Sequence, residues 1–216
     1  MHKELQFKKG EGYYKNEGDD LIKLVPKGIR RILDIGCGRG IVGKRLKENL
    51  GAEVVGVEVN PDAAEEAKKN LDKVYVVDIE TAKPDLGKEP FDCIIFGDVL
   101  EHLINPWQVV KDMKRYVARD GYVVISIPNI SHWPVVRGLL SGNWDYKGEG
   151  TLDITHLRFF TLKSAERMLK DAGFVIQCNA CRLSCNKFFK KINKLSGGKL
   201  THLLAWQYLI LAKKRE

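Results

Sequence analysis

The chain has 216 residues, of which 44% are hydrophobic, and it carries a formal net charge of +8. These values are normal for one globular domain with a single core. The longest apolar runs have the length of a strand and are broken by polar residues, which excludes a membrane-spanning helix. The first residues lack the apolar core of a signal peptide, so we expect a cytoplasmic protein with its five cysteines reduced.

A strand followed by three glycines comes after a polar segment. Residues 1–29 comprise a lead-in and a helix predicted over Asp19–Val25. An apolar strand over 31–35 then runs directly into Gly36, Gly38 and Gly40, and a helix is predicted from Ile41 to Asn49. Glycine allows a sharp turn and the close approach of a ligand, and the helix points its free N–H groups at that ligand. The pattern predicts a nucleotide-type cofactor site at the end of a parallel strand.

The glycine spacing separates two classes of cofactor. A dinucleotide fingerprint would place its third glycine at position 41, which is Ile41, whereas the third glycine here is Gly40. Asp34, which stands just before the turn, is also not part of the dinucleotide pattern. The spacing therefore disfavours a nicotinamide oxidoreductase.

Further apolar strands alternate with helices along the chain. The sequence predicts strands over 52–58, 74–78, 91–96 and 121–127. The first two end in the acids Glu58 and Asp78, and the third leads into Gly97-Asp98-Val99. An acid such as Glu58 can accept hydrogen bonds from both hydroxyls of a ribose. Any one of these acids could instead cap a helix or end a strand in solvent, but their ordered set favours a cofactor site.

The run Leu33-Asp-Ile-Gly-Cys-Gly-Arg-Gly40 resembles the first motif of class I S-adenosylmethionine-dependent methyltransferases. This resemblance implies one domain over residues 1–216, with a Rossmann-like, doubly wound α/β fold. Its seven-stranded sheet would be mostly parallel, with the last strand antiparallel. The runs Ile127-Pro-Asn and Asp153–Thr161 resemble a small-molecule branch of these enzymes. That branch includes ubiquinone-pathway O-methyltransferases, polysaccharide- and sugar-pathway methyltransferases, and methionine-biosynthesis-like proteins.

The resemblance also implies a set of contacts to S-adenosylmethionine. Asp78 would accept from the adenine amino group, and the N–H of Ile79 would meet a ring nitrogen. Tyr13 and Tyr14 would fold over the cofactor. The complete set of implied cofactor residues is Tyr14, Asp34, Gly36, Cys37, Gly38, Gly40, Glu58, Val59, Asp78, Ile79, Gly97, Asp98, Val99 and His102.

The substrate side is predicted to involve a long loop over residues 128–160, which holds two prolines and a glycine-rich run. Aromatic residues bracket this segment and could form a lid that excludes water; they are Trp133, Trp144, Tyr146, Phe159 and Phe160. We expect one of Phe159 and Phe160 to belong to the core instead. A helix over Thr161–Gly173, a sixth strand from Phe174 and a last strand over Trp206–Ala212 complete the chain.

Methyl transfer to a hydroxyl requires removal of its proton, and histidine is the usual base near neutral pH. The candidates are His102, His132 and His156, and Glu101 or Asp98 could orient the substrate or the base. Each histidine has a structural alternative. His102 could cap the next helix, and His156 with Arg158 could hold the loop against the fold.

The C-terminal part is basic. A basic amphipathic helix is predicted over residues 186–200, with Lys187, Lys190, Lys191, Lys194 and Lys199, and further cations stand at 213–215. This face could attract an anionic acceptor or a membrane surface, or it could be a solvated helix face that packs on the domain. A strand would place Cys178 and Cys181 on opposite faces, so the sequence predicts no metal site.

These patterns together predict an enzyme that methylates a small molecule. The acceptor would be a hydroxyl on a sugar, on a sugar-nucleotide or lipid-linked intermediate, or on a quinol-like phenol. One alternative is an RNA or protein methyltransferase, which the net charge favours. Against it, Gly97-Asp-Val-Leu100 lacks an Asn-Pro-Pro-Tyr type motif, and we expect no nucleic-acid partner. The other alternative is a catalytically silent protein that retains the fold and the cofactor.

Overall fold

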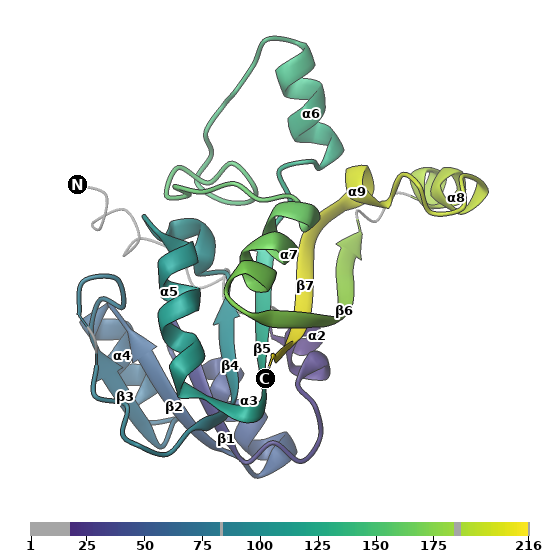
Figure 1. Ribbon diagram of the computed structural model, residues 1–216. Helices are drawn as coiled ribbons and strands as arrows, with labels where there is room; N and C mark the ends of the chain where they lie inside the picture. Colours follow the sequence, from purple (N-terminus) through teal and green to yellow (C-terminus); the bar gives the residue numbers. More distant parts are fainter. Residues whose placement is uncertain (1–17, 83, 184–186, 216) are drawn as a thin grey trace.

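The structure is a computed structural model that describes residues 18–82, 84–183 and 187–215 (Figure 1). The implied cofactor residue Tyr14 therefore lies outside the described residues. The helices are α2 (Asp19–Leu24), α3 (Ile41–Leu50), α4 (Pro61–Ala67), η2 (Leu100–His102), α5 (Pro106–Met113), η3 (Lys114–Tyr116), α6 (Trp133–Leu140), α7 (Leu162–Asp171), α8 (Lys187–Leu195) and α9 (Thr201–Leu204). The strands are β1 (Arg31–Ile35), β2 (Glu53–Glu58), β3 (Lys73–Val76), β4 (Phe91–Gly97), β5 (Val117–Pro128), β6 (Phe174–Leu183) and β7 (Ala205–Lys214).

The strands of the described residues form one seven-stranded sheet in the order β3-β2-β1-β4-β5-β7-β6. The pairs from β3 to β5 are parallel, whereas β7 is antiparallel to both β5 and β6. This arrangement confirms the predicted doubly wound α/β fold with an antiparallel last strand. The strand order reverses at β1, whose neighbours are β2 and β4, and ligands of such sheets bind at that reversal.

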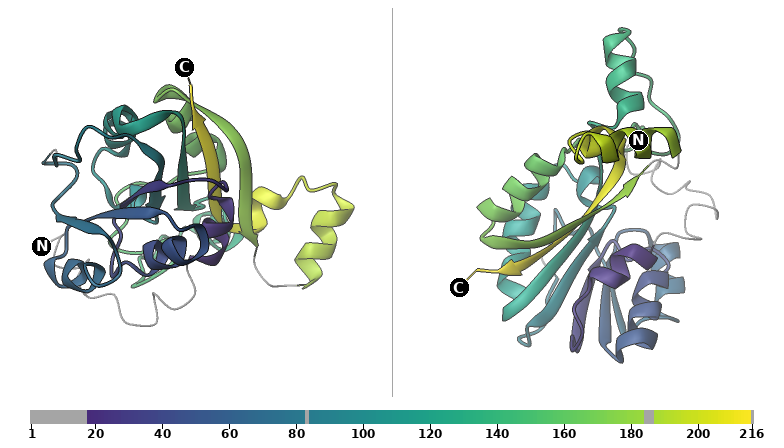
Figure 2. Two further views of the ribbon diagram at one scale, coloured as in Figure 1. Left: turned by 90° about the horizontal axis from the view of Figure 1, so that it is seen from below. Right: turned by 90° about the vertical axis from the view of Figure 1, so that its right-hand side faces the viewer.

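Helices cover both faces of the sheet because its central strands are apolar on both sides (Figure 2). On β1, Ile32 packs into a core with residues of α2, α3 and α4, whereas Leu33 and Ile35 pack into a core with residues of α5 and α7. Asp34 is the polar residue of this strand, and it is buried like its neighbours. A buried acid in a central strand requires a compensating partner.

Some predicted segments differ from the structure; the strand predicted over 121–127, for example, begins earlier, at Val117. The loop expected over residues 128–160 contains helix α6, which extends away from the sheet (Figure 1). Pro134 does not prevent this helix because it lies in the first turn, where the missing N–H would have had no partner. The basic helix predicted over 186–200 ends earlier, at Leu195, because Gly197 and Gly198 adopt positive φ angles.

The other predicted helices are confirmed to within a residue or two at their ends. Thr161 caps α7 through a capping box with Ser164, and Gly173 follows its end with a φ of 87°. Strand β3 ends at Val76, so Asp78 lies in the turn beyond the strand rather than at its last position. No helix of the described residues is long and apolar enough to cross a membrane.

Candidate functional site

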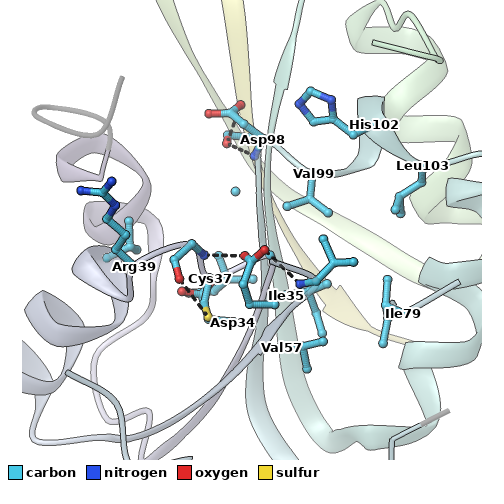
Figure 3. Close-up of a pocket in the computed structure, with 18 of the residues that line it drawn as sticks. Asp34, Ile35, Cys37, Arg39, Val57, Ile79, Asp98, Val99, His102 and Leu103 are labelled. Atoms are coloured by element: carbon cyan, nitrogen blue, oxygen red, sulfur yellow. Dashed lines mark hydrogen bonds between the residues drawn. The ribbon is translucent and has the colours of Figure 1, made fainter. Parts of the chain in front are cut away.

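A cavity of about 350 Å³ opens at the carboxyl ends of β1, β2 and β4, beside the point where the strand order reverses (Figure 3). Most of the residues that the family resemblance implies for cofactor binding line it. They are Asp34, Gly36, Cys37, Gly38, Glu58, Val59, Asp78, Ile79, Gly97, Asp98, Val99 and His102. The fold therefore brings the separate strand ends together around one space.

The glycine loop is tied to the end of the neighbouring strand. The N–H groups of Gly36 and Cys37 both donate to the carbonyl of Val57, at 2.7 and 3.1 Å. Gly36 has a φ of 69°, and a Cβ atom at this position would lie 2.3 Å from Cγ2 of Val99. Only glycine fits there, because a side chain would have both a strained backbone and a steric clash.

Gly40 has a different role from the other two glycines. It is the N-cap of α3 with a φ of 76°, and it does not line the cavity. A Cβ atom there would lie 3.1 Å from both Cα of Ala67 and Cγ of Leu71. Gly40 therefore lets the start of α3 pack closely against α4 and the turn that follows it.

Glu58 fixes the glycine loop through its carboxylate. Its Oε2 accepts a hydrogen bond from the N–H of Gly38 at 2.8 Å, and its Oε1 accepts from Val59 and Asn60 at 2.9 and 2.8 Å. The side chain is buried but still borders the cavity. A carboxylate offers about four acceptor sites, so Glu58 retains acceptor capacity for a hydroxyl donor from a ligand.

Asp34 is the second acid of the loop region. It is 3% exposed, and its Oδ2 atom has no hydrogen-bond partner within the described protein. Burial, and to a smaller extent the negative charge of Glu58, together raise the pKa of this carboxyl to about 7. A buried oxygen without a protein partner, beside a cavity, fits a ligand that carries a donor or a positive charge.

Cys37 is packed into the core below the loop. Burial raises the pKa of its thiol above the ordinary range, and the charges of Asp34 and Glu58 act in the same direction. The thiol is therefore neutral and is not a nucleophile. Gly56 on β2 makes room for it, since a Cβ atom there would lie 2.6 Å from its Sγ.

The loop after β3 contributes Asp78 and Ile79. One carboxylate oxygen of Asp78 accepts from the N–H of Glu80 at 3.0 Å, which shapes the turn. Glu80 also lines the cavity, and its carboxylate accepts from the N–H groups of Ile104 and Asn105 at 2.9 and 2.7 Å. This contact connects the turn after β3 to the start of α5 and closes one wall of the cavity.

Asp98 follows β4 in an unusual backbone conformation, with a φ of 53°. Its N–H donates to Oγ of Ser126 on β5 at 3.0 Å, and its Oδ1 accepts from Nε2 of Gln207 on β7 at 2.6 Å. Oε1 of Gln207 in turn accepts from Nη1 of Arg182 at 2.7 Å. Ser126 and Gln207 were not predicted from the sequence, since no local pattern marks two residues so far from Asp98 along the chain.

The fold brings two of the three candidate histidines together and leaves the third, His132, at the start of α6. His102 lines the cavity, next to Asp98 and Leu103 (Figure 3). His156 is buried behind it, with the two ring centroids 4.7 Å apart. His132 is the N-cap of α6 and is not among the residues that line the cavity; burial lowers the pKa of its imidazole. Of the three, His102 alone contacts the cavity.

The aromatic residues of the expected lid divide into two groups. Phe160 is fully buried and stacks near Trp107, so it belongs to the core, as expected for one of the pair. Trp144 contacts both Tyr146 and Phe159, and Phe159 contacts His156. Trp133 is exposed on α6. The second group forms an aromatic cluster beside His156, and its residues are not among those that line the cavity.

Comparisons with known proteins agree with this geometry. A family model described as a methyltransferase domain matches residues 9–179. The chain is 33% identical over 145 residues to ribosomal protein L11 methyltransferase from Thermosipho africanus, covering 58% of this chain and 53% of that protein. It is 31% identical over 109 residues to ubiquinone biosynthesis O-methyltransferase from Glaesserella parasuis, covering 46% of each. The chain thus spans about half the length of these two curated relatives.

Among solved structures, a methyltransferase from Archaeoglobus fulgidus superposes with a TM-score of 0.69. It is 23% identical, and the superposition covers 98% of this chain and 97% of that one, which shows a shared fold. The family match extends over more than half of the chain and includes the glycine loop and the acids Asp34, Glu58, Asp78 and Asp98. The chain therefore belongs to the methyltransferase domain family, and its fold is that of S-adenosylmethionine-dependent methyltransferases.

Proposed function

We propose that this protein transfers a methyl group from S-adenosylmethionine to an oxygen atom of a small-molecule acceptor. The observation that carries the proposal is the position of His102, which lines the same cavity as the glycine loop and the acids Asp34 and Glu58. An acceptor hydroxyl placed at His102 would enter the cavity opposite the glycine loop. Such an arrangement suits an in-line displacement, in which the protein contributes mainly positioning.

The acids of the cavity suit the positive charge of the methyl donor. Asp34 offers its partnerless Oδ2 to the ammonium group, and Glu58 offers acceptor capacity to the ribose hydroxyls. Asp78 and the N–H of Ile79 stand at the place where the adenine ring would lie. When bound, the donor supplies a methyl group activated by its sulfonium.

The acceptor side is built by residues that follow β4 and by the loop before α7. Leu157 and His102 line the same part of the cavity. The N–H groups of Leu157 and Arg158 donate to the carbonyl of Glu101 at 2.8 and 3.0 Å, so this loop is held against η2. The wall on which the acceptor would rest is therefore rigid, which favours a fixed distance between the hydroxyl and the methyl group.

The class of acceptor is inferred from two further features. Ubiquinone biosynthesis O-methyltransferases recur among the similar curated proteins, which supports a phenolic or other hydroxyl acceptor. Lys191, Lys194 and Lys199 are exposed on or just after α8, which lies beyond the carboxyl end of β6 (Figure 1). These cations support an acceptor that carries phosphate or another anionic group.

Protein methylation is a second candidate, because the chain is 33% identical to a ribosomal protein L11 methyltransferase over 145 residues. The net charge of +8 would suit an acidic protein partner. The two candidates differ in the product, since one labels a small molecule and the other labels a polypeptide.

Calorimetric titration with S-adenosylhomocysteine, with NAD as the control, tests the donor site. Micromolar binding of the first without the second is expected. Transfer of a radiolabelled methyl group to catechols, quinols, phosphorylated sugars and ribosomal protein extracts then tests the acceptor. Label in a phenol or sugar supports the proposal, and label only in polypeptide overturns it. Donor binding without any transfer would identify a catalytically silent domain.

A further inference from the structure

Glu101, His102 and His156 form a compact cluster beside the cavity. One oxygen or nitrogen atom of each lies within 4.8 Å of those of the other two. Glu101 and His156 are buried, whereas His102 is half-buried and borders the cavity. The hydrogen bonds from Leu157 and Arg158 to the carbonyl of Glu101 hold the two parts of the chain together. The cluster is thus a fixed feature of the fold.

The neighbours of His102 determine which of its nitrogens carries hydrogen. Its Nδ1 lies 3.1 Å from the carbonyl oxygen of Thr155 and 3.2 Å from the Oγ1 of that residue. The Thr155 hydroxyl donates its own hydrogen to Oδ1 of Asp153 at 2.6 Å, so it can only accept from His102. Nδ1 of His102 is therefore the donor, and Nε2 carries the lone pair in the neutral ring.

His156 is oriented in the same way. Its Nδ1 lies 3.1 Å from the carbonyl oxygen of Thr151, an acceptor that requires Nδ1 to carry hydrogen. Its Nε2 lies 4.0 Å from Oε1 of Glu101. In the neutral ring, a nitrogen lone pair thus faces a buried carboxylate. A cation held between two such electron-rich groups would offset their mutual repulsion.

We propose that these three residues bind a divalent transition-metal ion. Two imidazoles and one carboxylate are a ligand set for such ions, and bound zinc uses it with an open position for substrate. Histidine ligands of metals commonly donate their other N–H to a backbone carbonyl, as both histidines do here. The distance of 4.0 Å between Nε2 of His156 and Oε1 of Glu101 is too long for a hydrogen bond. It is close to the distance between two ligand atoms of a tetrahedral zinc ion, which is about 3.4 Å.

The ion would face the cavity through His102, at the wall where the acceptor is placed. Its role in methyl transfer rests on the proposed function. An acceptor hydroxyl that binds at an open coordination position has a lowered pKa and releases its proton to water. The oxygen then forms a bond to the methyl carbon, and the bond from that carbon to sulfur breaks with its electron pair left on sulfur. His102 would then serve as a ligand rather than as the base.

The first experiment measures metal binding directly. Protein treated with a chelator and dialysed is titrated with Zn²⁺ in a calorimeter, and a second sample is titrated with Co²⁺ while its visible absorption is recorded. We expect one equivalent of Zn²⁺ with micromolar or tighter affinity. The Co²⁺ spectrum should show the bands of nitrogen and oxygen ligands without thiolate charge transfer, which would instead indicate the cysteines of β6.

Variants assign the site. His102→Ala, His156→Gln and Glu101→Gln should each weaken Zn²⁺ binding by more than about 100-fold, since loss of even a supporting partner costs about 10- to 100-fold. His202→Ala is the matched control, because His202 is exposed on α9 and its Nδ1 also contacts a backbone carbonyl, that of Lys199. Circular dichroism verifies that each variant folds. If the variants at the buried residues Glu101 and His156 do not fold, Zn²⁺ binding by His102→Ala, at the half-buried position, tests the site.

The inference is overturned if the wild type takes up no ion at micromolar concentrations, or if His102→Ala binds Zn²⁺ like the wild type. It is also overturned if His202→Ala loses the ion as the cluster variants do. S-adenosylhomocysteine binding is measured on the same samples, with and without chelator. Donor binding without metal binding refutes the metal site alone, and metal binding without donor binding refutes the proposed function alone.

Discussion

The carboxyl of Asp34 is the group whose protonation should control donor binding near neutral pH. Burial and, second to it, the charge of Glu58 together raise its pKa to about 7. At pH 7 about half of the ligand-free molecules therefore carry a proton on Asp34. A ligand with an ammonium or sulfonium group favours the ionised form, so binding should release that proton.

The magnitude follows from this pKa. If only the ionised form binds, the apparent dissociation constant equals the intrinsic one multiplied by 1 + 10^(pKa − pH). That factor is about 1.1 at pH 8, about 2 at pH 7 and about 11 at pH 6. Affinity for the donor should thus fall about tenfold between pH 8 and pH 6. In Asp34→Asn, which cannot titrate, affinity should be low and independent of pH over this range.

Calorimetry at pH 6, 7 and 8, in two buffers with different heats of ionisation, measures the affinity at each pH and the number of protons released on binding. The wild type should release about half a proton at pH 7. Asp62→Asn, on the exposed first turn of α4, is the matched control and should keep the wild-type slope. A flat profile in the wild type, or an unchanged slope in Asp34→Asn, would refute the reasoning. Comparing S-adenosylmethionine with S-adenosylhomocysteine separates the sulfonium charge from the ammonium charge.

The same shift has a consequence for stability. An unfolded aspartate titrates near 3.8, and the folded pKa of Asp34 is raised to about 7. Its contribution is therefore fully present below about pH 4 and is lost as the pH rises to about 7. The free energy of unfolding of the ligand-free protein should fall by up to about 4 kcal/mol from this group over that range. Asp34→Asn should remove this component, which urea denaturation at several pH values would measure.

Three further substitutions test the construction of the site. Gly36→Ala should lower the free energy of unfolding by about 2 kcal/mol and abolish donor binding, because of its positive φ and the clash with Val99; a calorimetric titration that shows wild-type affinity would contradict this. Gln207→Leu should remove the buried hydrogen bond to Asp98 and lower the free energy of unfolding, measured in urea, by about 2 kcal/mol. Turnover should fall more than donor affinity, and equal losses in turnover and affinity would point to a purely structural role. Thr161→Ala should cost about 1 kcal/mol through loss of the α7 cap and leave donor affinity unchanged, so a change in affinity would show that α7 is coupled to the cavity.

Much of the donor side could be predicted from the sequence because its signals are local. The strand before Gly36 is apolar at Ile32, Leu33 and Ile35. The closely spaced glycines that follow it predict a turn, and they adopt positive φ angles in the structure. Glu58 and Asp78 follow apolar runs, and parallel strands bring their carboxyl ends to one edge of the sheet. Periodicity and turn residues act over a few positions, so they are readable without knowledge of the tertiary path.

The metal-ligand geometry and the support of Asp98 depended on the tertiary structure. The sequence predicted no metal site, and the proposal of one arises only because the loop before α7 folds back onto η2 and sets His156 beside Glu101. Gln207 reaches Asp98 because β7 inserts beside β5. Gly40 faces α4 rather than the ligand for a related reason, the packing of two helices. Local residue preferences determined the strands and the glycine turn, whereas contacts between distant residues were decided by the path of the chain, since no short-range preference encodes which side chains a returning loop will meet.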